Sequence, residues 1–522
     1  MPSRRFPNDY ETVTPVGRAP LRAGEDDNNW PVRQAVGAGD EHSAGDDEPH
    51  EFAAGETSSP APAPESAAPG NPQLLTEHWG TRRGGHLLSY LGIYLFTFIL
   101  YYRPYEQFAA LAGFTSMAFW SGLLTLVVFF PTQFALEGTL TARPREVNLV
   151  LLFALTALLS IPLAISPGEG WATFNDPFVK AVLMFIVMVN VLRTERRLKW
   201  LMFLALSAGA VLSVGALNNY RLGNLEVEGY RIAGVLGNLF RNPNDMATHL
   251  VTMLPIAVAF MFSTRGLHKR LLYGALVGLL VGGTVVSFSR AGFLGLAAGT
   301  FVLVWKIGRR NRVVTMLLVT FGLLAFLVLA PGNYYNRLFS IYDNSRDAVG
   351  SATARRELLI RSIIVALRHP LFGIGIGNFH IMSVHEAVSH NAYTQVASEM
   401  GMTAMVLYTM FIVTPIRRLR QIERETFATR RGSRFYYLAV GLQASLVAYM
   451  VSSFFASVAY QWYVYYLVGY AVALRRIYTV NRDALAAAKE AEAQLPAATG
   501  SEDADETDVL AHPEGTIGAL AR

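Results

Sequence analysis

The feature that most constrains the fold of this chain is a series of long apolar runs. Runs of about 20 residues recur between Leu87 and Tyr478, and each is long enough to cross a hydrocarbon layer of ~30 Å. Only 16% of the residues are charged, against roughly 25% in a soluble domain. The sequence therefore predicts an all-α, polytopic membrane protein. We count about twelve spans, which begin near Leu87, Phe108, Asn148, Phe178, Trp200, Met246, Leu271, Ala291, Val313, Ala392, Phe435 and Gln461.

The two ends of the chain differ from this apolar region. The first eighty residues are rich in Asp, Glu, Gly and Pro and lack apolar periodicity, which is typical of disorder. No basic stretch followed by an apolar run occupies the first thirty residues, so we expect no cleavable signal peptide. The expected organisation is a disordered tail (1–80), spans one to nine (81–330), a large loop (331–391), spans ten to twelve (392–480) and a second tail (481–522).

Arg- and Lys-rich groups occur at every second gap between the spans, from TRRGG to RRIY. Positive charge in short loops marks the cytoplasmic side of a membrane, so both tails are expected in the cytoplasm. The remaining loops then face outward: residues 218–245, the tight SFSR connection and the loop 331–391. Because that last loop contains the amphipathic pattern RRELLIRSIIVALRHP, we expect it to hold helices on the outer membrane face.

The stretch GIGIGNFHIMSVHEAVSHNAYTQVASEMG leads from this loop into the tenth span. It places His390 and Asn391 near the start of a helix that Ser389 is expected to cap. Glu399 follows two or more turns later, inside the membrane. An ionisable side chain at that depth is costly unless it is paired or lines a wet cavity, so we expect Glu399 to face another helix or a site.

The same stretch does not predict a metal or nucleotide site. His380, His385 and His390 are spaced by five residues, which rotates a helix by about 500° between neighbours and puts them on different faces. The glycines of GIGIGNF follow no predicted strand, so they are not a dinucleotide fingerprint. We expect them to form a tight turn after Pro370.

Basic residues on the expected outward side suggest chemistry on an anionic lipid. Arg290 lies in the SFSR turn, and Arg355 and Arg356 begin the loop helix. Guanidinium groups form bidentate, charge-assisted bonds with phosphate oxygens, which favours a lipid diphosphate as ligand. His390 is the candidate acid or base, since its reference pKa of about 6.5 lets it accept a proton near neutrality.

Each of these side chains also has a structural explanation. Arg290 could snorkel to lipid phosphate, Arg355 and Arg356 could anchor an interfacial helix, and His390 could be a hydrogen-bonded residue at a helix end. Their shared side of the membrane is what favours function. In RNPND, Asn242 and Asn244 supply a turn and a helix cap, and His249 is expected to be a packed residue with no role.

Four motifs in order resemble the O-antigen ligase and polymerase superfamily of bacterial envelope glycosyltransferases. They are GVLGNLFRNPNDMA, SFSRAGFLGL, RRELLIRSIIVALRHPLFGIGIGNF and SHNAYTQVASEMG, and the likeness runs from about Gly234 to Met405. The resemblance implies a multi-pass enzyme of the bacterial inner membrane. Such an enzyme takes a glycan from undecaprenyl diphosphate and passes it to an acceptor hydroxyl on the extracytoplasmic face.

The resemblance also assigns roles to positions. Arg290 matches the arginine of the SRxG-like turn, Arg355 or Arg356 matches the arginine that opens the loop helix, and His390 matches the histidine of the His-Asn pair. To these we add four residues that we expect to support the site: Asn391, Glu399, Asn242 and Asn244. The scheme requires no metal or other cofactor and no nucleic acid. The loop helix lacks the tryptophan that the superfamily often has after Arg-Glu-Leu. Because Arg355 and Arg356 are adjacent, either one can match the family's arginine.

Several functions remain open from the sequence. A ligase moves a finished glycan onto lipid A core, a polymerase extends the carrier-linked glycan to make O-antigen or exopolysaccharide, and other members glycosylate protein. Outside the superfamily, a secondary transporter has a similar number of spans, although we find no internal repeat, and a scaffold could keep the fold without chemistry. The acidic N-terminal tail hints at a polysaccharide-assembly partner.

Overall fold

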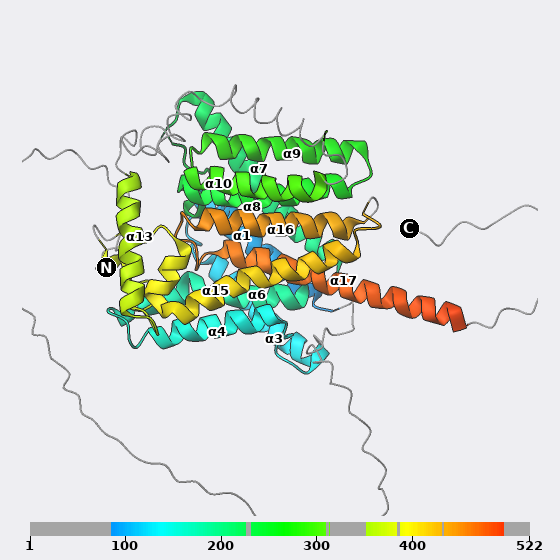
Figure 1. Ribbon diagram of the computed structural model, residues 1–522, viewed down its shortest axis with the longest axis horizontal. Coiled ribbons are helices and arrows are strands. Elements are labelled where there is room, and N and C mark those ends of the chain that lie inside the picture. The colour runs from blue at the N-terminus through cyan, green and yellow to red at the C-terminus, as the bar shows by residue number, and fades with distance from the viewer. Residues whose placement is uncertain are drawn as a thin grey trace, which may run out of the picture. The chain divides into compact units, whose positions relative to one another are not determined.

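The computed structural model describes residues 85–225, 231–308, 313, 351–383, 387–430 and 433–494. These residues belong to one compact unit, His78–Arg522, in which long helices lie side by side (Figure 1). The expected disordered tail 1–80 lies outside the described residues, as does the part of the large loop before Ser351. The principal helices are α1 (Leu87–Tyr102), α3 (Met117–Glu137), α4 (Arg145–Ser160), α6 (Val179–Val191), α7 (Glu195–Leu222), α8 (Pro243–Ser263), α9 (Leu267–Val286), α10 (Arg290–Ile307), α13 (Ser351–Arg368), α15 (Ala392–Glu425), α16 (Arg434–Ser453) and α17 (Trp462–Gln494).

The all-α prediction is confirmed for the described residues, which contain no strand. Among them, eight helices are long and apolar enough to span a membrane, so the count of twelve is not confirmed. Two further members of the bundle, α1 and α4, have only 16 residues each, fewer than the ~20 that a perpendicular crossing needs. The expected span near Val313 lies outside the described residues apart from Val313 itself.

Two helix boundaries differ from the sequence expectation. The second long helix starts at Met117 and not near Phe108. Arg103 adopts a left-handed conformation before Pro104, and two short helices, α2 (Pro104–Gln107) and the 3-10 helix η1 (Ala109–Leu111), precede α3. At the other end of the chain, α17 continues to Gln494, beyond the expected start of the tail at 481. Its alanine-rich sequence has high helix propensity, which accounts for this extension.

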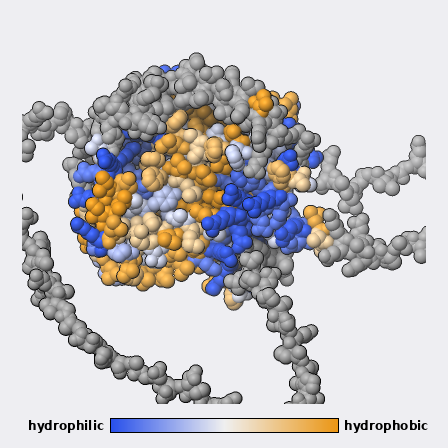
Figure 2. All heavy atoms as spheres, in the orientation of Figure 1, coloured by the Kyte–Doolittle hydropathy of each residue, from blue (hydrophilic) through white to orange (hydrophobic). Residues whose placement is uncertain are grey.

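The surface of the bundle matches a lipid environment. Figure 2 shows apolar side chains covering much of the visible face, with a hydrophilic area towards the side where α17 leaves the bundle. On α4, Leu152 is 49% exposed and Leu155 48% exposed, which would be costly in water. Exposed arginines, among them Arg417, Arg420 and Arg424, gather in the last turns of α15. The chain is therefore a multi-pass membrane protein.

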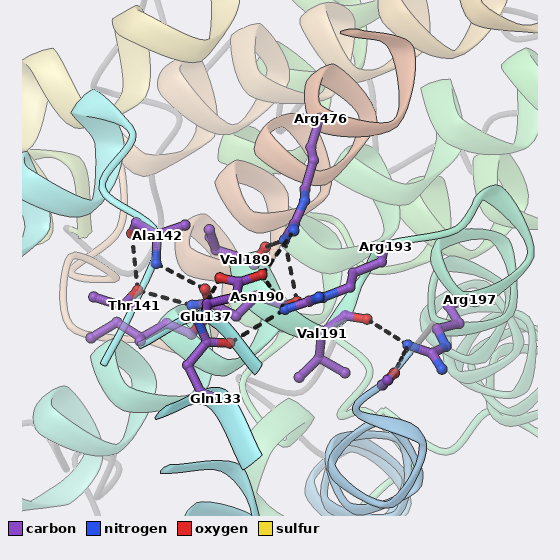
Figure 3. A network of polar contacts seen from close by, with 12 residues as sticks. Gln133, Glu137, Thr141, Ala142, Val189, Asn190, Val191, Arg193, Arg197 and Arg476 are labelled. Atoms are coloured by element: carbon purple, nitrogen blue, oxygen red, sulfur yellow. Dashed lines mark hydrogen bonds and ion pairs between the residues drawn. The ribbon is translucent and has the colours of Figure 1, made fainter. Parts of the chain in front are cut away.

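One end of the bundle is held by buried ion pairs (Figure 3). Glu137 at the end of α3 accepts hydrogen bonds from Arg193 at 2.6 Å and from Arg476 of α17 at 3.5 Å. Asn190, at the end of α6, donates to the Thr141 hydroxyl at 2.9 Å. Because charges in a low-dielectric interior need partners, these contacts fix where α3, α6 and α17 meet. We call this the Glu137 end.

The opposite end is where α8, α10, α15 and α17 begin, and we call it the His390 end. Here α13 runs across the bundle and packs on α15 (Figure 1). It buries Leu358 and Val365 against the bundle and leaves Ile360 and Leu367 exposed. The helix expected from RRELLIRSIIVALRHP is thus present. Which end faces the cytoplasm remains a prediction from the loop charges.

Candidate active site at the His390 end

His390 immediately precedes the N-cap of α15 and adopts a left-handed conformation with φ of 52°. The cap of α15 is Asn391, whose Oδ1 accepts hydrogen bonds from the backbone N–H groups of Tyr393 at 2.9 Å and Thr394 at 3.1 Å. The expectation that Ser389 caps this helix is therefore wrong. Its hydroxyl instead donates to the Asn391 carbonyl at 3.0 Å, so both polar neighbours of His390 hold the turn that orients it.

The surroundings of His390 keep its imidazole neutral. Burial, and to a smaller extent the nearby Arg355 guanidinium, together lower the pKa of His390 to about 4. The backbone N–H of His390 donates to the Ser457 hydroxyl at 2.9 Å. An uncharged imidazole can accept a proton near pH 7. Of the two adjacent arginines, Arg355 is half-buried and acts on His390, whereas Arg356 is exposed.

Arg290 begins α10 directly after the tight connection expected from SFSR. The turn is sharp because Phe288 adopts a φ of 51°, and the Ser289 hydroxyl caps α10 by accepting from the Gly292 N–H at 3.1 Å. The Arg290 side chain is 9% exposed. Most of Arg290 is therefore enclosed by the protein at the start of α10.

The two asparagines of RNPND hold this turn against α8. Asn242 caps α8 by accepting from the Asn244 N–H at 2.8 Å, as the sequence predicts. Asn244 Oδ1 in turn accepts from the Ser289 hydroxyl and from Arg231 Nη2, each at 2.8 Å. Arg231 is 2% exposed and was not predicted, because nothing in the loop sequence sets it apart from other outward arginines.

The Arg290 turn and the His390 turn both pack against the last turns of α16. On α10, a Cβ at Gly295 would lie 3.1 Å from the Ala448 carbonyl oxygen and 3.1 Å from Ser452 Cβ. On α15, the Tyr393 hydroxyl donates to the Met450 carbonyl at 3.2 Å. The structure therefore brings Arg290, Arg355 and His390 to one end of the bundle, as their predicted shared side requires.

Glu399 lies inside α15 and is 3% exposed. Its carboxylate accepts hydrogen bonds from the backbone N–H groups of Gly377 at 3.0 Å and Phe379 at 3.3 Å, and from the Tyr460 hydroxyl at 2.6 Å. Glu399 was expected to face another helix or a site, and its observed partners lie instead in the segment around Gly377 and in the α16–α17 connection. Its observed contacts give it a positioning role, since they fix the glycine-rich loop and the α16–α17 connection to α15.

The glycines of GIGIGNF form the expected tight turn. Gly373, Gly375 and Gly377 all have positive φ, at 66°, 101° and 72°. At Gly373 an added Cβ would lie 2.3 Å from the Glu399 carbonyl carbon, so only glycine fits there. The loop also pairs with α15 through the backbone, since the Gly375 N–H donates to the Glu399 carbonyl at 2.9 Å.

The other histidines have structural contacts. His380 Nε2 lies 2.8 Å from Glu169 Oε2, and its Nδ1 lies 2.9 Å from the Gly377 carbonyl oxygen. His385 lies outside the described residues. His249 is 1% exposed, and its Nε2 lies 3.1 Å from the Ala205 carbonyl oxygen, which confirms that it is a packed residue. The described residues contain no group of three or more metal-ligating side chains.

Comparison with known families gives one match, which covers part of the chain. Residues 275–409 match the O-Antigen ligase family. The resemblance inferred from the four motifs is confirmed over this segment, which contains Arg290, Arg355, Arg356, His390 and Glu399. Asn242 and Asn244 precede the O-antigen ligase segment.

The chain was also compared with curated proteins and with solved structures. No curated protein matches the chain. Among solved structures, a chain from a study titled "Structural coordination of polymerization and crosslinking by a peptidoglycan synthase complex" aligns at 18% identity with a TM-score of 0.38. The alignment covers 65% of this chain and 97% of that one. That TM-score is too low to assign a shared fold.

Proposed function

We propose that the protein is an O-antigen ligase-like glycosyltransferase. It takes a glycan from an undecaprenyl diphosphate carrier and transfers it to an acceptor hydroxyl at the extracytoplasmic face of the bacterial inner membrane. The observation that carries the proposal is His390, held neutral beside Arg355 within the O-antigen ligase segment. An imidazole that is uncharged at pH 7 has a free ring nitrogen that can accept the proton of the acceptor hydroxyl, and the adjacent Arg355 cation can offset negative charge on the leaving group.

The chemical step balances with these groups alone. His390 accepts the proton of the acceptor hydroxyl, whose oxygen forms a new bond to the anomeric carbon of the glycan. The bond between that carbon and the diphosphate oxygen breaks, and its electron pair leaves with the carrier. Arg290 and Arg355 are assigned to the diphosphate, where fixed positive charge offsets the negative charge that develops. Loss of a general base typically costs ~10²–10⁴-fold in rate.

The remaining residues are assigned by their contacts. Asn391 holds the His390 turn as the cap of α15, and Asn244 holds the Arg290 turn through Ser289. Glu399 holds the glycine-rich loop against α15. Arg356 is exposed, and we assign it to the membrane surface; of the two adjacent arginines, we therefore propose Arg355 for the diphosphate.

A complementation experiment tests this function. A deletion strain receives wild-type protein, His390→Ala or Arg356→Ala, with membrane abundance checked by immunoblot, and its surface glycans and lipid-linked intermediates are profiled. We expect His390→Ala to abolish glycan transfer and Arg356→Ala to retain it. If His390→Ala restores normal glycans, the histidine mechanism is wrong and a transporter or scaffold gains support.

The intermediate that accumulates in the same experiment identifies the acceptor. Long glycans that stay on the carrier would identify a ligase acting on lipid A core or another acceptor. Single repeat units on the carrier would identify a polymerase of O-antigen or exopolysaccharide. The family match is common to both reactions, so this measurement decides between them.

A further inference from the structure

A hollow of about 530 Å³ lies at the His390 end, apart from the residues assigned to transfer. Its walls come from the end of α1, the starts of α3 and α6 and the start of α17. We call it the Trp462 pocket. Its volume falls within the ~300–1,000 Å³ of typical small-molecule sites.

One part of the wall is aromatic. Trp462 and Phe96 lie with their ring centroids 5.3 Å apart and are nearly buried, at 6% and 3% exposed. Phe119, from the start of α3, also lines the hollow and is 49% exposed. Flat aromatic faces of this kind pack against the C–H faces of sugar rings as they do against other apolar surfaces.

The polar part of the wall carries balanced charge. Lys180 Nζ lies 2.8 Å from Asp176 Oδ2, and both residues line the pocket. Arg103, a third lining residue, lies 2.5 Å from the Glu106 carboxylate. With each cation paired to a carboxylate, the pocket offers both donors and acceptors but no excess positive charge. A phosphate ligand would require such an excess, whereas an uncharged polyhydroxyl compound uses donors and acceptors together.

The pocket is connected to the proposed active site through the α16–α17 connection. Ser457 in this connection accepts the hydrogen bond from the His390 N–H, and Tyr460 donates to Glu399. The next residue along the chain, Gln461, lines the pocket together with Trp462. Phe178, the residue after the lining residue Pro177, packs its ring against Tyr460 at 5.7 Å between centroids. A ligand in the pocket therefore sits against the segment that positions His390.

We propose that the Trp462 pocket binds an uncharged sugar unit of the glycan handled at the His390 end. This inference rests on the proposed function and adds a glycan subsite to it. The sugar packs against Phe119, over whose ring Lys180 Nζ lies at 5.8 Å from the centroid, and its hydroxyls bond to Asp176 and Lys180. It belongs either to the carrier-linked glycan or to the acceptor, since both present the same chemistry.

Binding to the purified full-length protein in nanodiscs tests the subsite directly. The probes are oligosaccharide fragments of the strain's surface polysaccharide, core oligosaccharide released from its lipid A, and glycerol phosphate as a lipid-headgroup control. The variants are Phe119→Ala and Asp176→Asn. We expect one of the two sugar probes to bind and each variant to weaken that binding by roughly three- to tenfold.

The chain offers matched controls for both variants. Trp120 follows Phe119 in sequence and is 63% exposed, so Trp120→Ala removes a neighbouring aromatic residue outside the pocket. Lys199 and Glu195 form the same i,i+4 ion pair as Lys180 and Asp176, at 2.5 Å, but at the start of α7. Glu195→Gln therefore controls for the loss of an ion pair. Both controls should bind the sugar as wild type does.

The outcomes separate the subsite from the catalytic proposal. Whichever sugar probe binds identifies the source of the ligand, carrier-linked glycan or acceptor. The inference is overturned if neither sugar binds, if only glycerol phosphate binds, or if the pocket variants bind as tightly as their controls. His390→Gln should retain sugar affinity while losing transfer. Transfer that survives in His390→Gln would count against the proposed function and leave the binding result to stand by itself.

Discussion

The depressed pKa of His390 leads to a quantitative prediction for the pH dependence of transfer. The acid limb of kcat/KM reports the free enzyme's essential base, so its midpoint should lie near the pKa of about 4. At pH 5.5 a base with that pKa is still about 97% neutral, whereas one at the reference value of 6.5 is about 9% neutral. Lowering the pH from 7.5 to 5.5 should therefore leave kcat/KM almost unchanged, where an ordinary histidine would lose roughly tenfold.

Replacing the arginine beside His390 tests the cause of this shift. Arg355→Gln removes a cation that disfavours imidazolium, so the pKa of His390 should rise and the acid limb should move towards neutrality. The midpoint of the acid limb should remain below the reference pKa of about 6.5, because burial is the larger cause of the shift and persists in the variant. The matched control is Arg356→Gln, which changes the adjacent, exposed arginine and should leave the limb where it is.

The assay uses protein in nanodiscs, carrier-linked glycan and a soluble acceptor, with initial rates measured from about pH 3 to about pH 8, so that the range includes a midpoint near the pKa of about 4. A return to pH 7.5 after each acid incubation shows whether lost rate reflects protonation or unfolding. A wild-type midpoint near 6.5 would refute the reasoning. So would an acid limb that moves in Arg356→Gln and stays in place in Arg355→Gln.

Three further predictions concern the framework of the site, each measured by thermal unfolding of purified protein. Tyr460→Phe removes one of three hydrogen bonds to Glu399 and should cost about 1 kcal/mol; an unchanged midpoint would mean that this bond contributes nothing. Gly373→Ala should cost more than ~1 kcal/mol because of its positive φ, whereas Gly168→Ala, at a position with open space for a Cβ, should not destabilise. Glu137→Ala leaves two buried arginines without this partner and should cost about 3–5 kcal/mol; a loss below ~1 kcal/mol would show that water solvates them.

The sequence predicts most of the helices because their signal is local. A run of about 20 apolar residues that crosses a membrane forms a helix, because a helix satisfies its backbone hydrogen bonds within the segment. The predicted starts at Leu87 and Ala392 match the structure. The error at Ser389 is also local: both Ser389 and Asn391 are good caps, and the left-handed turn at His390 places the asparagine at the N-cap. Caps one or two residues apart are hard to separate by type alone.

Residues that join the site from distant parts of the chain could not be predicted. Ser457 and Tyr460 lie in a short connection with no motif, and their contacts with His390 and Glu399 exist only once α17 packs beside α15. Arg231 could likewise be linked to the site only from its hydrogen bond to Asn244, which the sequence does not reveal. The Trp462 pocket is a clearer case, because its walls come from four separate helices.

The central claim is that His390 is the base in glycan transfer from an undecaprenyl diphosphate carrier. The most direct test is single-turnover transfer by purified protein, following release of undecaprenyl diphosphate from a labelled carrier-linked glycan in the presence of acceptor. We predict release by wild type and a rate at least ~10²-fold lower for His390→Gln, with carrier binding retained. Release at the wild-type rate by His390→Gln, or no release by wild type with any acceptor, would contradict the account.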